Sequence, residues 1–289
     1  MNQKDNSFEQ QMSHYRTQAI LGIVVAVLGV IIFLKAIIST FSMFPTLLGF
    51  AIIASGIGLF AHASSSMKNK VGVVIARKVM DRIFDSYQYL PDHHISDQII
   101  ENTEIPNLGY FEDIEGNDYI SGKYKGLNFE MSDIHLTRTE TTTDSDGHTS
   151  TTTVTVFNGL WFICDFAKEI RSRITVSPKV LLSFSKGIQT ESEVFNKTFY
   201  VKAGNDHDAF YVLTPHLMEK MVMTRNHVNC EMYYAFEKDG KVQILVNRGN
   251  SLEVNALSSS VEKLEEKFEK QLTEVTSLVD ELKLTEAYH

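Results

Sequence analysis

The chain has 289 residues, 43% of them hydrophobic, and a formal net charge of −9. An acidic chain without a run of Lys and Arg repels phosphate backbones, which argues against nucleic-acid binding. The two cysteines, Cys164 and Cys230, lie in hydrophobic stretches. Such positions favour buried free thiols, and a disulfide between the two is the alternative.

Two apolar segments near the N-terminus stand out from the rest of the chain. The first runs from Ala19 to Leu34, the second from Phe44 to Ala61, and a connector of a few residues joins them. With their flanking residues, both reach the roughly 20 apolar residues that a helix needs to cross a bilayer. Lys35 can extend its amine to the membrane surface and does not oppose a span. The sequence therefore predicts a transmembrane helical hairpin over residues 17–63.

Basic residues predict the orientation of this hairpin in the membrane. The connector side has only Lys35, whereas the two outer ends carry Lys4, Arg16, Lys68, Lys70, Arg77 and Lys78. Because positive charge is enriched on the cytoplasmic side, we expect a cell-membrane protein with both termini and the soluble domain in the cytoplasm. A cleaved signal peptide is the alternative for the first segment. The mixed charges before it and the missing small-residue cleavage site argue against that alternative.

Small residues recur four positions apart in both apolar segments. The pairs are Gly22 with Ala26, Ala51 with Ser55, and Ala54 with Gly58. This spacing lets helices approach closely, so a homo-oligomer through the hairpin is one interpretation. The other is that small residues are common in all membrane helices, and the sequence leaves both open.

The remaining chain divides into four further parts by composition, residues 1–16, 64–91, 92–257 and 258–289. Residues 1–16 form a cytoplasmic N-terminal segment, and a polar break at 64–66 is expected to end the hairpin. The apolar residues Ile75, Val79, Met80, Ile83, Phe84 and Tyr87 predict a juxtamembrane amphipathic helix within 64–91. This helix lies either on the inner leaflet or in the core of the soluble domain, which we expect over 92–257.

The soluble domain has the alternating pattern of short β-strands. Strands are predicted at 119–124, 127–136, 157–166, 174–176, 180–184, 199–203, 209–213, 230–236 and 242–246. A short helix begins after Ser96, and a longer one has Thr214 as its cap and Pro215 in its first turn. The sequence therefore predicts an α+β fold with a mainly antiparallel sheet and a few packed helices.

Residues 137–155 are rich in threonine and predict a long exposed β-hairpin that turns at the Asp-Gly of residues 146–147. Its exposed polar residues form a candidate interaction surface: Thr141, Thr142, Thr143, Asp144, Asp146, Thr151 and Thr152.

Catalytic and metal motifs are missing from the sequence. Phosphate-binding loops, dinucleotide fingerprints, zinc-protease motifs and nucleophile elbows are absent, and we expect no cofactor and no metal. His93 and His94 are adjacent and therefore point apart, which fits exposed loop residues. The weak catalytic candidates are Asp206, His207 and Asp208, where a histidine between two carboxylates could relay a proton.

The C-terminal segment, 258–289, predicts an amphipathic helix. Ser259 and Glu262 resemble a capping box, and a heptad seam of Val261, Leu264, Phe268, Val275, Leu278 and Leu282 is interrupted by Gln271. Barely three heptads favour a helix docked on the sheet, and a dimerising helix is the alternative.

Several stretches of the soluble domain resemble an uncharacterised bacterial membrane-protein family, the domain of unknown function 3137. They are residues 118–122, 157–161, 193–195 with 199–201, and 208–217, of which 211–215 (Tyr-Val-Leu-Thr-Pro) is the most specific. The resemblance implies an N-terminal membrane hairpin and a LemA-type membrane protein as a partner. It implies no established reaction.

Two hypotheses follow from these observations. The first is a membrane-anchored cytoplasmic module without enzymatic activity that binds a protein or a lipid at the inner membrane face. The second is a membrane-tethered enzyme of unrecognised class.

Overall fold

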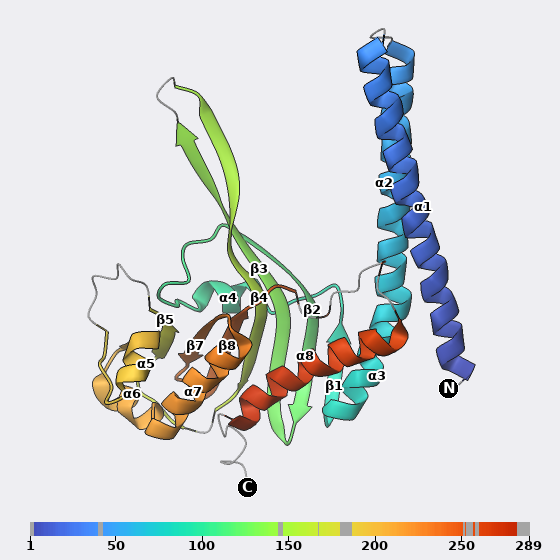
Figure 1. The fold of residues 1–289 in the computed structure, drawn as a ribbon. Helices are drawn as coiled ribbons and strands as arrows, with labels where there is room; N and C mark the ends of the chain where they lie inside the picture. Colours follow the sequence, from blue (N-terminus) through green and yellow to red (C-terminus); the bar gives the residue numbers. More distant parts are fainter. Residues whose placement is uncertain are drawn as a thin grey trace. The chain divides into compact units, whose positions relative to one another are not determined.

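The computed structural model describes residues 3–39, 43–143, 147–166, 168–179, 187–250, 252, 257 and 260–281 (Figure 1). It divides the chain into two compact units. One unit comprises Met1–Arg82 with Leu252–Lys270, and the other comprises Ile83–Ser251 with Gln271–His289. The predicted strand at 180–184 and the cap residue Ser259 lie outside the described residues.

The first unit contains the predicted hairpin as two long helices, α1 (Gln3–Ser39) and α2 (Met43–Met67). The residues buried between them are mostly small: Ala19, Gly22, Gly29 and Ala36 of α1, with Gly49, Gly56 and Ala63 of α2. A Cβ atom built on Gly56 would lie only 2.5 Å from the backbone nitrogen of Ala26. The small residues therefore let the two helices of one chain pack backbone to backbone.

Helix α2 does not end at the serines of residues 64–66, as the sequence suggested. It continues through a short π-helical turn, η1 (Lys68–Gly72), into α3 (Val73–Ile83). The serines tolerate a helix here, because the flanking Ala63 and Met67 are fully buried. Residues 86–90, expected to continue the amphipathic helix, form strand β1 (Ser86–Leu90) instead.

The apolar face of α3 is buried within the first unit. Ile75, Val79 and Met80 are at most 2% exposed. Within the same unit, Arg82 pairs with Glu269 of α8 (Val261–Glu281) at 3.1 Å. Helix α3 therefore buries its apolar side in protein, but it belongs to the first unit with α1 and α2. The predicted position in the core of the soluble domain is not confirmed, because the sheet lies in the second unit.

The second unit is built on one eight-stranded antiparallel sheet with the order β1-β2-β3-β4-β8-β7-β5-β6. Its strands after β1 are β2 (Asp113–Tyr124), β3 (Leu127–Thr143), β4 (Thr149–Asp165), β5 (Ile174–Pro178), β6 (Phe199–Ala203), β7 (Glu231–Phe236) and β8 (Lys241–Asn247). Residues 157–166, the most hydrophobic part of this unit, run through the centre of the sheet, as predicted. The α+β fold with a mainly antiparallel sheet is confirmed.

Tight turns connect neighbouring strands, in the short gaps between the predicted strand ranges. Lys125 and Gly126 link β2 to β3 and have φ values of 48° and 80°, which are typical of a type I′ turn. Gly240, with φ 75°, closes the turn between β7 and β8. Each of these glycines adopts a backbone conformation that side-chain-bearing residues rarely take.

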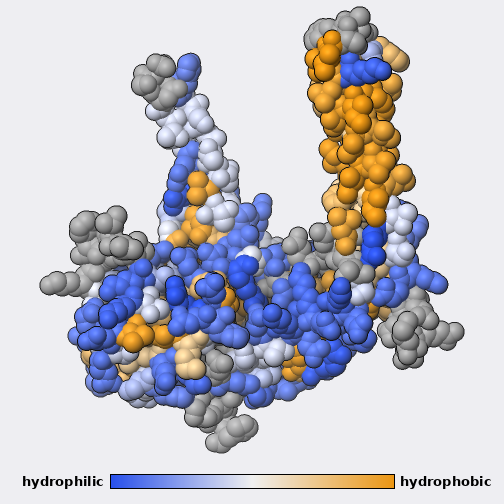
Figure 2. Space-filling model, viewed as in Figure 1, coloured by the Kyte–Doolittle hydropathy of each residue, from blue (hydrophilic) through white to orange (hydrophobic). Residues whose placement is uncertain are grey.

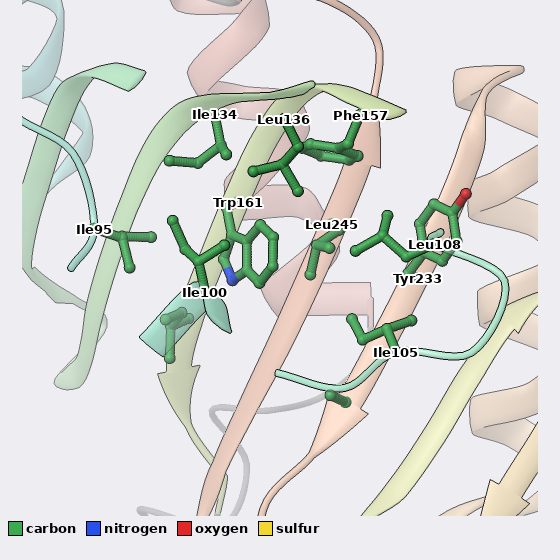
Figure 3. Close-up of a cluster of buried hydrophobic side chains, with 12 residues drawn as sticks. Ile95, Ile100, Ile105, Leu108, Ile134, Leu136, Phe157, Trp161, Tyr233 and Leu245 are labelled. Atoms are coloured by element: carbon green, nitrogen blue, oxygen red, sulfur yellow. The ribbon is translucent and has the colours of Figure 1, made fainter. Parts of the chain in front are cut away.

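One face of the sheet carries a hydrophobic core cluster (Figure 3). Trp161, Leu245 and Tyr233 of β4, β8 and β7 pack beneath Ile100 of α4 (Asp97–Asn102) and the chain that follows it. The indole Nε1 of Trp161 donates a hydrogen bond to Oε1 of buried Gln243 at 2.9 Å. Thr103 donates to the same oxygen at 3.0 Å. This buried polar group is therefore satisfied, as a stable core requires.

The opposite face is covered by helices. They are α5 (Glu193–Thr198), α6 (Asp206–Val212), α7 (Pro215–Val228) and, within this unit, the part of α8 from Gln271 onwards. Thr214 caps α7 as predicted, because its side chain accepts from the backbone N–H of Leu217. Tyr124 donates to Asp280 of α8 at 2.9 Å, so this part of α8 docks on the sheet.

The strand predicted at 209–213 is wrong. These residues lie mostly in α6, where Ala209 and Val212 are buried and Phe210 and Tyr211 are exposed. A run of five apolar residues fits a strand as well as a short helix, and the Asn205 cap decides in favour of the helix.

Candidate functional site

The threonine-rich hairpin is the most exposed regular element of the second unit (Figure 1). Towards the ribbon, the pairing of β2 with β3 stops at Asp113 and Thr137, and the pairing of β8 with β4 stops at Val246 and Leu160. Apart from the pair of Thr137 with Asp113, residues 137–143 of β3 and 149–155 of β4 pair only with each other among the described strands. We call this two-stranded element the ribbon. The candidates Asp144 and Asp146 at its tip lie outside the described residues.

The register gives the ribbon two different faces. On one face, four threonine pairs lie directly across the strands: Thr137 with Thr155, Thr139 with Thr153, Thr141 with Thr151, and Thr143 with Thr149. On the other face, Arg138, Glu140 and Thr142 lie opposite Val154, Thr152 and Ser150. Thr141, Thr142, Thr143, Thr151 and Thr152 are all exposed. The candidate interaction residues that the structure describes therefore all lie in the ribbon, but on two different faces of it.

A β-bulge separates the ribbon from the sheet. Leu136 lies opposite Phe157 and Thr137 lies opposite Thr155, so Val156 is an extra residue on β4. A bulge of this kind shifts the alternation of side chains and strengthens the local twist. On the sheet side of Val156, the apolar side chains of Leu136 and Phe157 lie opposite each other. On the ribbon side of Val156, threonine side chains lie opposite each other.

Glu112 closes the base of the outer edge of β3, next to the sheet. The backbone oxygen of Thr137 accepts from the backbone N–H of Glu112 at 2.8 Å. The backbone N–H of Thr139 donates to the Glu112 carboxylate at 2.9 Å. Thr137 and Thr139 therefore direct their main-chain groups away from β4. This carboxylate cap was not foreseen from the sequence, because Glu112 precedes β2 and no motif marks it.

The outer edge of β4 is open. Main-chain groups alternate in direction along a strand. The N–H and C=O groups of Thr155 and Thr153, which lie opposite Thr137 and Thr139, therefore point away from β3, and so do those of Thr151 and Thr149. Among the described residues, no strand pairs with β4 on this side before Leu160. Residues 149–157 carry no charged side chain, although natural sheet edges are commonly blocked by charges or prolines. We call the outward side of residues 149–155 the open edge.

The candidates Asp206, His207 and Asp208 do not form a catalytic group. The side chain of His207 is 90% exposed, and Asp206 is exposed beside it. Asp208 is buried, and its Oδ2 accepts hydrogen bonds from the backbone N–H groups of Arg171 and Ser172 at 3.0 and 2.8 Å. Asp208 therefore holds the turn at Arg171 and Ser172 against the start of α6.

The electrostatics of Asp208 fit this structural role. Burial alone would raise the pKa of its carboxyl group. Hydrogen bonds from the Ser172 hydroxyl and N–H, the Arg171 N–H and the Asn205 amide outweigh burial and lower the pKa below its ordinary value. The group is an anion at neutral pH whose Oδ2 accepts four hydrogen bonds, and it is poorly suited to proton transfer.

A small polar cleft lies on the sheet face that carries the core cluster. It has a volume of about 170 Å³, and its polar lining consists of Tyr119, Ser121, Asn128, Glu130, Asp165 and Lys241. Tyr119 donates to Glu130 at 3.1 Å, and Asn128 donates to Asp165 at 2.7 Å. The cleft is smaller than typical ligand pockets of about 300–1,000 Å³, and its polar groups bond to each other.

Both cysteines are free thiols in the structure, Cys164 buried and Cys230 half-buried. Burial raises the pKa of each thiol, so neither is an activated nucleophile. Among the described residues, no group of three or more His, Cys, Asp or Glu side chains is placed to hold a metal ion. The ring nitrogen Nδ1 of His94 lies 2.7 Å from the backbone oxygen of Ile95.

The predicted anchor residues include one that is buried between the two helices and four that are exposed on their outer surface. Ala19 is fully buried between α1 and α2, whereas Leu34 and Phe44 are 51% and 78% exposed. Lys35 and Ala61 are also exposed. Both helices are long and apolar enough to cross a membrane.

Comparison with known families adds one finding. The model of the family described as "Protein of unknown function (DUF3137)" matches residues 155–284. The family resemblance of the sequence is confirmed over these residues. The match covers less than half of the chain, and it includes neither α1 and α2 nor the ribbon before Thr155.

Curated proteins and solved structures add little. No curated protein matches this chain. A crystal structure of the mycobacterial trehalose monomycolate transport factor A, TtfA, is similar at 11% identity over 72% of this chain and 94% of that chain. The TM-score is 0.36, which is too low to support an inference about this chain.

Proposed function

We propose that this chain is a membrane-anchored module that binds a protein partner at the inner membrane face through the open edge of its ribbon. The observation that carries the proposal is an uncharged strand edge, residues 149–155, whose outward main-chain groups face no neighbouring strand among the described residues. Such an edge is a template for an extended strand of another polypeptide, which adds main-chain hydrogen bonds.

The surface of α1 and α2 supports the anchoring part of the proposal. Apolar side chains cover the outside of the helix pair (Figure 2), and Leu21, Ile31 and Phe44 are among many that are more than half exposed. Water disfavours a continuous apolar surface of this kind, whereas the interior of a bilayer does not. The basic residues on the outer flanks of the hairpin support a cytoplasmic position for the soluble part.

A protein partner fits the structure better than a lipid does. The cleft of about 170 Å³ is smaller than typical ligand pockets, although Phe129 and Ile163 contribute apolar surface to its lining. The apolar face of α3 is already buried and is not available to a bilayer surface. The outer part of the ribbon is white to blue in Figure 2, without the continuous apolar surface that insertion into lipid requires.

Crosslinking in native membranes tests the proposal. A photoreactive amino acid at Ser150, which is exposed and lies in the ribbon, should capture a defined protein. The double substitution Thr151→Lys and Thr153→Lys places charges beside the open edge and should reduce capture about tenfold or more. Surface changes of this type rarely alter folding by more than about 0.5 kcal/mol.

Thr139→Lys with Thr141→Lys is the matched control. These residues lie directly opposite Thr153 and Thr151 on the same face, but they belong to the strand whose edge Glu112 closes. The control variant should keep full capture. Equal loss in both double variants, or no loss in either, would contradict a role for the open edge.

A further inference from the structure

We infer that the strand received by the open edge is the same edge of a second copy of this chain, in an antiparallel arrangement with its two-fold axis at Thr152. This inference names the partner and rests on the proposed function. It would extend the two-stranded ribbon of each copy into one four-stranded sheet.

The residue pattern of the open edge is self-complementary. With the axis at Thr152, Thr149 lies opposite Thr155 of the second copy, and Thr151 lies opposite Thr153. All four residues that direct main-chain groups outwards on one copy then meet four such residues on the other. Moving the axis by one residue leaves fewer of them paired, so the register is specified.

The side chains agree with this pairing. Each new pair of outward residues joins threonine to threonine and continues the four threonine pairs that already cross the ribbon. Cross-strand pairs of threonine stabilise antiparallel sheets. On the other face, Thr152 meets Thr152, and Ser150 meets Val154. No charged residue enters the new interface, although the chain as a whole carries a net charge of −9.

The opposite edge of the ribbon lacks this self-complementarity. The equivalent symmetric pairing of β3 would place the axis at Glu140, with one Glu140 directly opposite the other. Like charges directly across two strands destabilise a sheet. The Glu112 carboxylate also occupies the N–H of Thr139 on that edge. The β3 edge of the ribbon is therefore less suited to a second copy than the open edge of β4.

Membrane anchoring favours such a contact. Two apolar helices would confine every copy to one surface and raise its local concentration, so even a weak pairing of a few residues becomes populated. A single short strand edge suits a reversible contact of this kind better than a permanent interface.

Disulfide trapping tests the pairing in the full chain reconstituted in lipid bilayers. Thr152 would lie opposite Thr152 of the second copy in a non-hydrogen-bonded pair. The Cα atoms of such a pair are about 4.5 Å apart, which is within the range for a disulfide. Thr152→Cys should form a covalent dimer under mild oxidation, at least about fivefold more than the wild-type chain. Cys164 and Cys230 lie outside the ribbon, and the wild-type chain gives their background.

Ser150→Cys is the matched control, because residue 150 would face residue 154 of the second copy. Alone it should give only background dimer, whereas Ser150→Cys mixed with Val154→Cys should give a mixed dimer. Absence of the Thr152→Cys dimer, or an equal amount from Ser150→Cys alone, would overturn the pairing.

The two proposals can fail separately. If no disulfide dimer forms at Thr152 while the probe at Ser150 still captures a different protein that depends on the open edge, the self-pairing is wrong and the proposed function stands. If neither product forms, both are wrong.

Discussion

The Glu112 carboxylate accepts a hydrogen bond from the backbone N–H of Thr139 at 2.9 Å and so closes the base of one edge of the ribbon. Directly across from Thr139 lies Thr153, whose main-chain groups point out of the other edge. At this pair of residues one edge of the ribbon is occupied, whereas no described strand lies along the other. This asymmetry is the basis of the function proposed for the chain.

Glu112→Ala should release the Thr139 amide. The hydrogen bond is expected to contribute about 1 kcal/mol, so exchange of this amide with solvent should accelerate about fivefold. Hydrogen exchange resolved to single residues measures the effect. Glu112→Gln keeps a side-chain oxygen as acceptor and should retain much of the protection. If both variants exchange like the wild-type chain, Glu112 does not close the edge.

The packing of α1 against α2 depends on glycine. A Cβ atom on Gly56 would lie 2.6 Å from the backbone oxygen of Gly22, so Gly56→Val should force the helices apart and cost about 1–3 kcal/mol. Gly58→Val is the control, because no atom lies within 4 Å of the position of its Cβ. Unfolding of the full chain in detergent should separate the two variants. Equal stability would contradict this helix interface.

The indole of Trp161 supports the core through Gln243. Trp161→Phe removes the 2.9 Å hydrogen bond to Gln243 and part of a fully buried ring, and should cost about 1–3 kcal/mol. Because Trp161 is the only tryptophan, urea unfolding must be followed by circular dichroism rather than by its fluorescence. A variant as stable as the wild type would show that this contact contributes little.

Acid should weaken the turn held by Asp208. The folded state lowers the pKa of this carboxyl group, so its stabilising contribution is complete above the ordinary pKa of about 3.9 and disappears as the pH falls through the lower folded value. Asp208→Asn should be less stable than the wild type at neutral pH, and the difference should shrink below about pH 4. Thermal unfolding at several pH values measures it, and a difference independent of pH would refute the assignment.

The sequence was most informative where its signal was local. The apolar segments predicted α1 and α2, the two-residue gap between the strands at 119–124 and 127–136 predicted a hairpin, and Thr214 with Pro215 predicted the start of α7. Each of these signals lies within a few residues, and the chemistry that produces it acts over the same distance.

Features that depend on distant residues could not be predicted in this way. The serines of residues 64–66 suggested a break, but burial of Ala63 and Met67 keeps the helix intact. The role of Asp208 depends on Arg171 and Ser172, more than 30 positions away. The open edge of β4 follows from the point where β8 ends, which no pattern in the threonine segment records.

Hydrogen exchange of the full chain in its native membranes reports directly on whether a strand occupies the open edge of the ribbon. If a strand occupies the open edge, the amides of Thr149, Thr151, Thr153 and Thr155 should be protected, and Thr151→Lys with Thr153→Lys should abolish that protection. The amides of Ser150, Thr152 and Val154 face β3 and should stay protected in both chains. Rapid exchange at the four outward amides of the wild-type chain, beside slow exchange at the inward ones, would contradict the account.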